Sequence, residues 1–277
     1  MRKVGIVGCS NGRKTTYEER LDVLKNTLLD MGLEPVCSDV LFEIENVFSG
    51  TSLERANALM EMYEDSKITD IYDISGGDLA NGVLPYLDYE VIEKSNSTFW
   101  GYSDLTTIIN AIYTKTGKPS ILYQVRNLIK PEQIEIFRKT VIENKKDLFK
   151  FKYEFIQGNQ MEGIVLGGNI RCLLKLAGTE YWPDFSNKIL LLESLSGKAA
   201  KMETYLCQLQ QLGVFNQVNG IILGTFTEME ENDCKPDIVD LVMGIVGIDM
   251  PIVRTKEIGH GIDSKAIMIG KEMKFRK

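Results

Sequence analysis

The sequence has very little histidine, since His260 is the only one among 277 residues. A histidine-based metal centre is therefore not expected, because such a site needs several imidazole or thiolate ligands. The cysteines are odd in number, are scattered and form no Cys-x-x-Cys pair. They are Cys9, Cys37, Cys172, Cys207 and Cys234. This distribution predicts neither a disulfide framework nor a zinc site, and it favours a reducing cytoplasm.

Long apolar runs and long basic runs are also missing. No apolar stretch reaches about 18 residues, so no transmembrane helix is expected. The start of the chain, Met1 to Gly8, has only a short apolar run and turns polar afterwards, which indicates a first strand rather than a signal peptide. The net charge is −7, and the one lysine-rich segment is the short tail from Lys271 to Lys277. Nucleic-acid binding normally needs a basic face, so we do not expect it.

Nucleotide-binding glycine motifs are absent as well. The sequence has no Gly-Lys-Ser/Thr loop, and Gly5, Gly8 and Gly12 match a dinucleotide-binding loop only loosely. The sequence therefore predicts no organic cofactor at its first turn.

Short apolar runs alternate with amphipathic segments along the whole chain. The predicted strands are 4–7, 33–36, 70–75, 98–102, 163–166, 189–192, 220–223 and 251–253. The predicted helices are 17–31, one from 51, 104–114, 131–144, 170–176, 198–212 and 237–244. This alternation predicts a mostly parallel α/β sheet with helices on both faces. The length favours two domains, residues 1–155 and residues 156–277.

Three segments together suggest a nucleophilic catalytic site. Ser103 follows a predicted strand where the chain turns into a helix, which is the position of an exposed nucleophile. A serine hydroxyl needs a base, and His260 is the one histidine available. Glu193 ends an apolar strand, where its carboxylate could orient an imidazole. The order Ser103, Glu193, His260 is a plausible hydrolytic triad.

Each of these residues also has a structural interpretation. Ser103 could be the N-cap of the helix that follows it, because serine is a preferred cap. Glu193 could be a solvated carboxylate at a strand end, and His260 a structural histidine between glycines that permit unusual backbone angles.

The segment Gly76-Gly77-Asp78 follows a predicted strand and could form an oxyanion hole. A glycine amide in a tight turn can direct its N–H at developing negative charge, and the amide of Asp104 would be the second donor. The alternative is a simple strand-end turn. We expect Gly76 and Asp78 to contact substrate beside the Gly77 amide.

A set of motifs in this order resembles the LD-carboxypeptidases, serine peptidase family S66, including its microcin C immunity branch. The resemblance covers nearly the whole chain. The segments are Ser49–Thr51, Glu54–Ala56, Ser75–Asp78, Leu84–Tyr89, Gly101–Thr106, Lys115–Gly117, Leu166–Asn169, Ala177–Thr179, Pro183–Phe185, Leu190–Glu193 and Gly259–His260.

The resemblance implies a Rossmann-like, class I glutamine-amidotransferase-like N-terminal domain and a smaller α/β C-terminal domain. By motif position it implies Ser103 as nucleophile, Glu193 as orienting carboxylate and His260 as general base, with Gly77 and Asp104 as oxyanion amides. It also implies a homodimer without metal or organic cofactor. The chain departs from the family pattern near the expected pocket: Ser194 replaces a usual acidic residue, Ser120–Gln124 contains no His-Gly-Pro, and Gly261-Ile262 follows the histidine.

Two substrate classes fit this chemistry. One is a muropeptide tetrapeptide that loses its terminal D-alanine in peptidoglycan recycling, for which Arg171 could bind the carboxylate. The other is a peptidyl- or aminoacyl-nucleotide of the microcin C type, cleaved for antibiotic resistance, for which Trp182 could stack on the base or could simply pack at a loop–core boundary. A non-catalytic binding protein on the same scaffold is a third possibility, because fold does not fix function.

Overall fold

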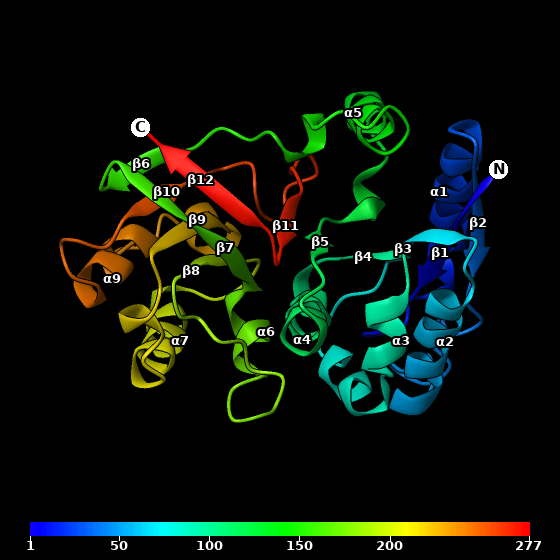
Figure 1. Ribbon diagram of the computed structural model, residues 1–277, viewed down its shortest axis with the longest axis horizontal. Coiled ribbons are helices and arrows are strands. Elements are labelled where there is room, and N and C mark those ends of the chain that lie inside the picture. Colours follow the sequence, from blue (N-terminus) through cyan, green and yellow to red (C-terminus); the bar gives the residue numbers. More distant parts are fainter.

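The computed structural model describes residues 1–277 and contains two six-stranded sheets that lie side by side (Figure 1). The strand order is β11-β5-β4-β3-β1-β2 in the first sheet and β12-β7-β8-β9-β10-β6 in the second. The mixed α/β class predicted from the sequence is confirmed. None of the helices is both long enough and apolar enough to cross a bilayer.

The first sheet is built from residues 2–122 together with one strand from near the end of the chain. Its elements are β1 (Arg2–Val7), α1 (Glu18–Asp30), β2 (Leu33–Cys37), α2 (Ser52–Glu64), β3 (Ile68–Asp73), α3 (Tyr89–Lys94), β4 (Thr98–Gly101), α4 (Thr106–Thr116) and β5 (Ser120–Leu122), followed by α5 (Pro131–Val141). Strands β1 to β5 pair in parallel. Their order, 2-1-3-4-5, is that of a doubly wound sheet, in which ligands bind beyond the carboxyl ends where the order reverses.

Local sequence signals set several of these helix ends. Thr51 and Glu54 form a capping box at the start of α2, and Pro131 is the first residue of α5. Gly117 ends α4 with a φ of 70°, a left-handed conformation that glycine adopts without steric cost. The predicted helices therefore begin and end close to their expected positions.

The second sheet is built from residues 154–276. Its elements are β6 (Glu154–Gln157), β7 (Gln160–Asn169), α6 (Ile170–Leu174), β8 (Lys188–Ser194), α7 (Ala199–Gln211), β9 (Gly220–Phe226), α8 (Thr227–Glu231), α9 (Ile238–Ile245), β10 (Ile252–Arg254) and β12 (Glu272–Arg276). Strands β7 to β10 pair in parallel, and the two edge strands are antiparallel to their neighbours. The carboxyl ends of β8 and β10 thus lie at one edge of this sheet.

The two sheets are joined through helix α4. The Asn110 side chain donates to Gly167 O (3.0 Å) and accepts from Gly167 N (2.9 Å), so it completes both hydrogen bonds of a residue in β7. Thr106 Oγ1 accepts from Asn169 N at 3.0 Å. One apolar core of 54 buried residues extends from α2, α3 and α4 into the second sheet, and a second core of 18 lies between the first sheet and α1 and α5.

Strand β11 (Ile267–Ile269) was not predicted from the sequence. Although it lies between β10 and β12 in the sequence, it pairs antiparallel with β5 and forms an outer strand of the first sheet (Figure 1). A three-residue strand has too little periodicity to be recognised in a sequence. Residues 267–269 thus belong to the first sheet although they follow residue 155 in the sequence. A single domain boundary near residue 155 stays a prediction.

Candidate active site

The residues expected to be catalytic lie where strands of both sheets end. Ser103 follows β4, Gly77 lies beyond β3, Glu193 is near the end of β8, and His260 lies in the loop after β10. Helices α4 and α6 lie next to each other between the two sheets (Figure 1). This arrangement brings the carboxyl ends of the two sheets toward one another.

Ser103 occupies a sharp turn between β4 and α4. Its φ is +56°, a conformation that costs a non-glycine residue about 1–2 kcal/mol and is found at nucleophile elbows. The turn leaves Ser103 partly exposed, and its hydroxyl forms no hydrogen bond within the protein. Gly101 is required two residues earlier, because an added Cβ would lie 2.6 Å from Leu105 Cβ.

Ser103 does not cap α4. It begins a 3₁₀ turn, Ser103–Leu105, and the residue at the N-cap position of α4 is Leu105, which makes no side-chain cap bond. The capping interpretation of Ser103 is therefore wrong, since the positive φ turns its side chain away from the helix start.

Glu193 and His260 form a buried pair. His260 Nδ1 lies 2.8 Å from Glu193 Oε2, and the glutamate has no exposed surface. A carboxylate can only accept, so Nδ1 carries the hydrogen and Nε2 is the nitrogen left to act as base. Nε2 is buried and has no hydrogen-bond partner, Ser103 included. Catalytic hydrogen bonds of this kind commonly tighten only when substrate is bound.

Tyr102 joins this pair from the residue before Ser103. Its hydroxyl donates to the same Glu193 oxygen at 3.0 Å, and its ring packs edge-on to the His260 ring with centroids 4.8 Å apart. Burial, followed by the charge of Glu193, raises the pKa of Tyr102 well above its usual value, so the hydroxyl remains a donor. Sequence reasoning missed this residue, because no spacing shows that its side chain crosses to the second sheet.

The loop that carries His260 is anchored on both sides. Thr225 N donates to Ile258 O at 2.8 Å, and Asn127 Nδ2 donates to Gly261 O at 3.0 Å. A Cβ on Gly259 would overlap the Thr225 side chain. The glycine beside the histidine thus serves close packing of the loop on β9.

The turn at Gly76 and Gly77, where we expect an oxyanion donor, packs closely against Asn11. Gly77 has a φ of 134°, and a side chain there would overlap the amide of Asn11. Asn11 Oδ1 accepts from Asp78 N at 2.9 Å, which fixes the turn, while the Gly77 N–H donates to no acceptor in the protein. An N–H without a partner in the protein is available to a ligand, as an oxyanion donor must be.

The Asp104 side chain is a buried junction between the two halves of the chain. Its Oδ2 accepts from Ser10 Oγ (2.7 Å) and Ala80 N (2.8 Å), and its Oδ1 accepts from Lys175 Nζ (2.5 Å). Lys175 also donates to Asp78 O at 2.8 Å. Lys175 was not predicted. Its position four residues after Arg171, on the same face of the segment that begins with α6, is the signal that could have identified it.

The two further substrate-binding candidates have partners in the structure. Arg171 forms an ion pair with Asp78 and donates to Gly77 O at 2.8 Å, so its charge is already matched and a role in capturing a free carboxylate is not favoured. Trp182 is half-buried and packs edge-on to Phe185 with centroids 5.2 Å apart. This packing favours the loop–core interpretation of Trp182.

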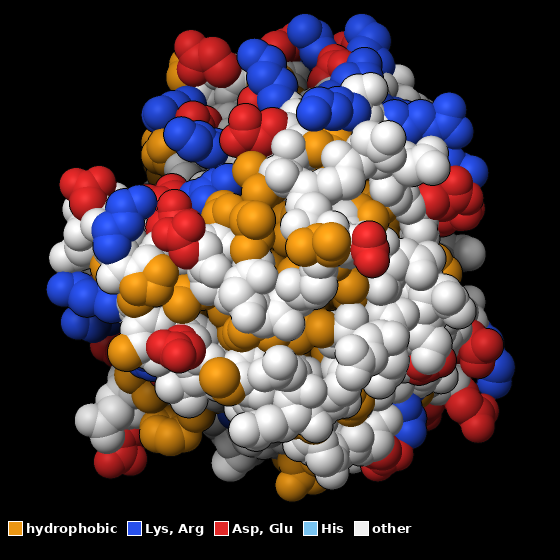
Figure 2. Space-filling view, turned by 90° about the vertical axis from the view of Figure 1, so that its left-hand side faces the viewer, with side chains coloured by type: hydrophobic (Ala, Val, Ile, Leu, Met, Phe, Trp, Pro, Cys, Tyr) orange, Lys and Arg blue, Asp and Glu red, His pale blue; other side chains and the backbone are white.

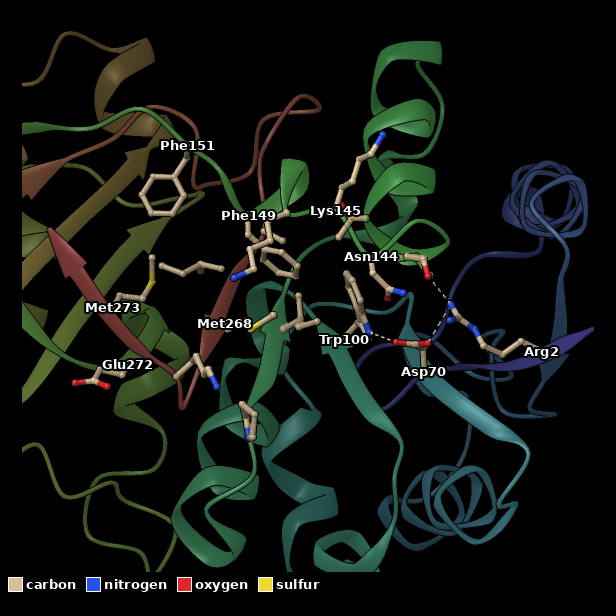
Figure 3. A pocket seen from close by; sticks show the side chains of 18 residues that line it. Arg2, Asp70, Trp100, Asn144, Lys145, Phe149, Phe151, Met268, Glu272 and Met273 are labelled. Atoms are coloured by element: carbon tan, nitrogen blue, oxygen red, sulfur yellow. Dashed lines mark hydrogen bonds and ion pairs between the residues drawn. The ribbon is translucent and has the colours of Figure 1, made fainter.

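A cavity of about 640 Å³ lies away from this site, and its lining includes none of Ser103, Glu193 and His260. Figure 3 shows Trp100, Phe149 and Met268 in its lining, with Asp70 bound to Trp100 and paired with Arg2. No group of three histidine, cysteine, aspartate or glutamate side chains is arranged to hold a metal ion.

Comparison with known proteins places both halves of the chain in one family. The LD-carboxypeptidase N-terminal domain model matches residues 4–123, and the LD-carboxypeptidase C-terminal domain model matches residues 162–275. The microcin C7 self-immunity protein MccF of Escherichia coli is 32% identical over 211 residues, 64% of this chain and 61% of that protein. A probable murein peptide carboxypeptidase of Bacillus subtilis is 26% identical over 270 residues, 91% of this chain and 82% of that protein.

A solved structure shares the same fold. MccF in complex with aspartyl sulfamoyl adenosine superposes with a TM-score of 0.87 at 23% identity, covering 98% of this chain and 92% of that one. The two family models together cover well over half of the sequence. The chain therefore belongs to the LD-carboxypeptidase family, the serine peptidases of family S66, and is a hydrolase.

Proposed function

We propose that this hydrolase cleaves an amide bond next to a terminal group of its substrate, with Ser103, Glu193 and His260 as its triad. The observation that carries the proposal is the buried Glu193–His260 pair, 2.8 Å apart, beside a serine held at a φ of +56°. Further support comes from Tyr102, the residue before Ser103, which donates to Glu193 at 3.0 Å and packs its ring against that of His260.

The chemistry follows from the geometry of these groups. Ser103 Oγ attacks the scissile carbonyl while His260 Nε2 takes its proton and then gives it to the leaving amine. Glu193 keeps the imidazole in the tautomer that has Nε2 free. The amides of Gly77 and Asp104 hold the oxyanion of the tetrahedral intermediate. Water activated by His260 then releases the acyl group from Ser103.

The first candidate substrate is a muropeptide tetrapeptide that releases terminal D-alanine, which would place the protein in peptidoglycan recycling. The support is the relative from Bacillus subtilis, whose similarity extends over 91% of this chain. Such a substrate is a small peptide and needs no nucleic acid or membrane partner.

The second candidate is a peptidyl- or aminoacyl-nucleotide, which would make the protein an amidase of the microcin immunity type and a resistance factor. The support is the 32% identity with MccF, a protein whose fold is also seen with aspartyl sulfamoyl adenosine bound. In this case Trp182 would stack on the nucleotide base. Because its ring already packs against Phe185, we favour a structural role for Trp182 over base stacking.

Mass spectrometry of the purified protein with each substrate tests both candidates. Loss of one D-alanine from the tetrapeptide supports the carboxypeptidase, and release of aspartate only from an aspartyl-adenylate analogue with a cleavable amide supports the amidase. Ser103→Ala is expected to remove either activity by a factor of about 10³ or more. Unchanged turnover by Ser103→Ala would overturn the proposed mechanism.

We also propose a cytoplasmic homodimer. All five cysteines are free thiols, which suits a reducing compartment. Figure 2 shows the face on the α9 side, where apolar side chains form patches between charged ones. Met243 on α9 and Ile248 after it are 45% and 87% exposed. Light scattering after gel filtration tests the proposal, and Ile248→Asp is expected to convert a dimer built on this face to monomer.

A further inference from the structure

Two arginines beside the oxyanion turn have no carboxylate partner. Arg13 follows β1, and Arg126 lies in the 3₁₀ turn Val125–Asn127 after β5. Like Ser103, both arginines follow the carboxyl ends of strands of the first sheet. Strand β1, before Arg13, neighbours β3, and strand β5, before Arg126, neighbours β4. Neither guanidinium takes part in any ion pair of the protein, unlike Arg171, which pairs with Asp78, and Lys175, which pairs with Asp104.

The two side chains converge on Gly76. From the point where a Cβ on Gly76 would lie, Arg13 Nη2 is 3.8 Å away and Arg126 Nη2 is 3.9 Å away. Gly76 directly precedes Gly77, whose free N–H is the proposed oxyanion donor. The two guanidinium groups thus meet one residue away from the position where the scissile carbonyl would bind.

Most of the donors of these arginines are unused. Arg13 donates to Ile74 O through Nε (2.8 Å) and Nη2 (2.5 Å), and its guanidinium lies over the Tyr17 ring at 5.5 Å. Arg126 donates to no protein acceptor, and its Nε is buried without a partner. Burial, followed by the charge of Arg13, lowers the pKa of Arg126 to about 10, so this group remains a cation at neutral pH.

The charge of the nearby Asp73 carboxylate favours the charged form of both arginines, but the carboxylate forms no ion pair with either. Its Oδ2 accepts from Cys9 N at 2.8 Å, and its Oδ1 accepts from Ser75 N at 2.7 Å and from Ser75 Oγ at 2.5 Å. Two like charges that are close together and have no ion-paired carboxylate are stabilised when an anion binds between them. Two planar guanidinium forks are well suited to a carboxylate or a phosphate-like group.

We propose that Arg13 and Arg126 bind the anionic group on the leaving side of the scissile bond. This inference rests on the proposed function and deepens it. In a carboxypeptidase substrate the terminal carboxylate belongs to the residue after the scissile carbonyl, about 3.8 Å further along the chain. In an acyl sulfamoyl nucleotide the sulfamoyl group occupies the corresponding position. Both sources present an anion one step beyond the carbonyl, beside Gly76.

Binding measured without turnover tests the assignment. Titration calorimetry on Ser103→Ala protein would compare L-Ala-D-Glu-L-Lys-D-Ala with its C-terminal carboxamide. The acid is expected to bind at least about tenfold more tightly than the amide, as charge-assisted hydrogen bonds predict. Adding Arg13→Gln or Arg126→Gln should remove this preference. Adding Arg138→Gln, an exposed arginine of α5 paired with Glu135, should leave it unchanged.

Arg126→Lys guards against a misfolded Gln variant, because it keeps the charge and loses only the planar fork. It should show a preference between those of the parent and of Arg126→Gln. A preference that persists in both Gln variants overturns the assignment. If aspartyl sulfamoyl adenosine alone binds, a loss of about tenfold or more in Arg126→Gln supports a nucleotide as the source, and unchanged affinity overturns the assignment. Turnover of the tetrapeptide by Ser103→Ala would overturn the proposed mechanism, whereas a preference that persists in the Gln variants of an inactive Ser103→Ala protein overturns this assignment alone, so the two failures are distinguishable.

Discussion

At the scale of single residues, the orientation of the proposed base depends on one oxygen atom. Glu193 Oε2 contacts both His260 Nδ1 and the Tyr102 hydroxyl, while its other oxygen is buried without a partner. Tyr102 is therefore a positioning residue. Its hydroxyl hydrogen-bonds to the Glu193 carboxylate, and that carboxylate orients the imidazole of His260.

Tyr102→Phe is expected to lower kcat. Without the hydroxyl, Glu193 Oε2 keeps only His260 Nδ1 as a partner, so the carboxylate and the imidazole are held less firmly. The loss of one buried hydrogen bond should lower kcat by about tenfold. Tyr123→Phe is the matched control, since that hydroxyl is buried without any partner. Steady-state kinetics compares the two, and equal kcat values in Tyr102→Phe and Tyr123→Phe would contradict the positioning role.

Gly77→Ala tests the oxyanion turn. The new methyl group would overlap Asn11 and displace the Gly77 N–H, so kcat should fall by a factor of about 10² to 10³. Gly178→Ala is the control, because Gly178 has a φ of 78° with open space around it. That variant should lose about 1 kcal/mol of stability and keep its kcat. Steady-state kinetics and thermal unfolding measure both effects, and equal kcat losses in the two variants would count against the turn.

The residues whose roles depend on local sequence could be predicted, and those whose roles depend on contacts between elements could not. Ser103 and Glu193 were chosen because each ends or follows a predicted strand, and His260 because it is the only histidine. Tyr102 and Lys175 act through contacts across the two sheets. Arg171 was expected to be a free cation because the sequence does not show that Asp78 lies opposite it.

At the scale of elements, α6 and the residue after it connect the second sheet to the proposed catalytic turn. Lys175 reaches Asp104, which is fully buried, and removal of the ammonium would leave that carboxylate without its ionic partner. Lys175→Met is therefore expected to destabilise the protein by about 3 kcal/mol or more. Lys201→Met, at an exposed lysine of α7 without an ion pair, should change stability by less than about 0.5 kcal/mol. Chemical denaturation compares the two, and similar midpoints would show that Asp104 does not depend on Lys175.

Strong periodicity made the long elements predictable, and short length hid the others. The amphipathic helices α1, α4 and α7 and the apolar strand β8 were expected close to their observed ranges. Strands β5, β6, β11 and β12 were not, because each is too short for its alternation to be recognised, and all except β5 lie at sheet edges.

At the scale of the whole molecule, the chain crosses between its two halves more than once. Strand β11 completes the first sheet although it follows nearly all of the second. A fragment of residues 1–155 would therefore expose the buried backbone edge of β5, and it should aggregate. The same fragment fused to residues 264–271 through a flexible linker should be more soluble. Gel filtration of both distinguishes them, and a monomeric, folded fragment 1–155 would show that β11 is dispensable.

Because His260 is the only imidazole in the chain, every imidazole resonance in a proton NMR spectrum of this protein belongs to the proposed base. Its Nδ1 hydrogen, enclosed between the ring and Glu193, is shielded from exchange with solvent by burial. The titration of the base, its response to an inhibitor and the effect of each variant can thus be followed at one atom, without isotopic labelling and without an assignment step.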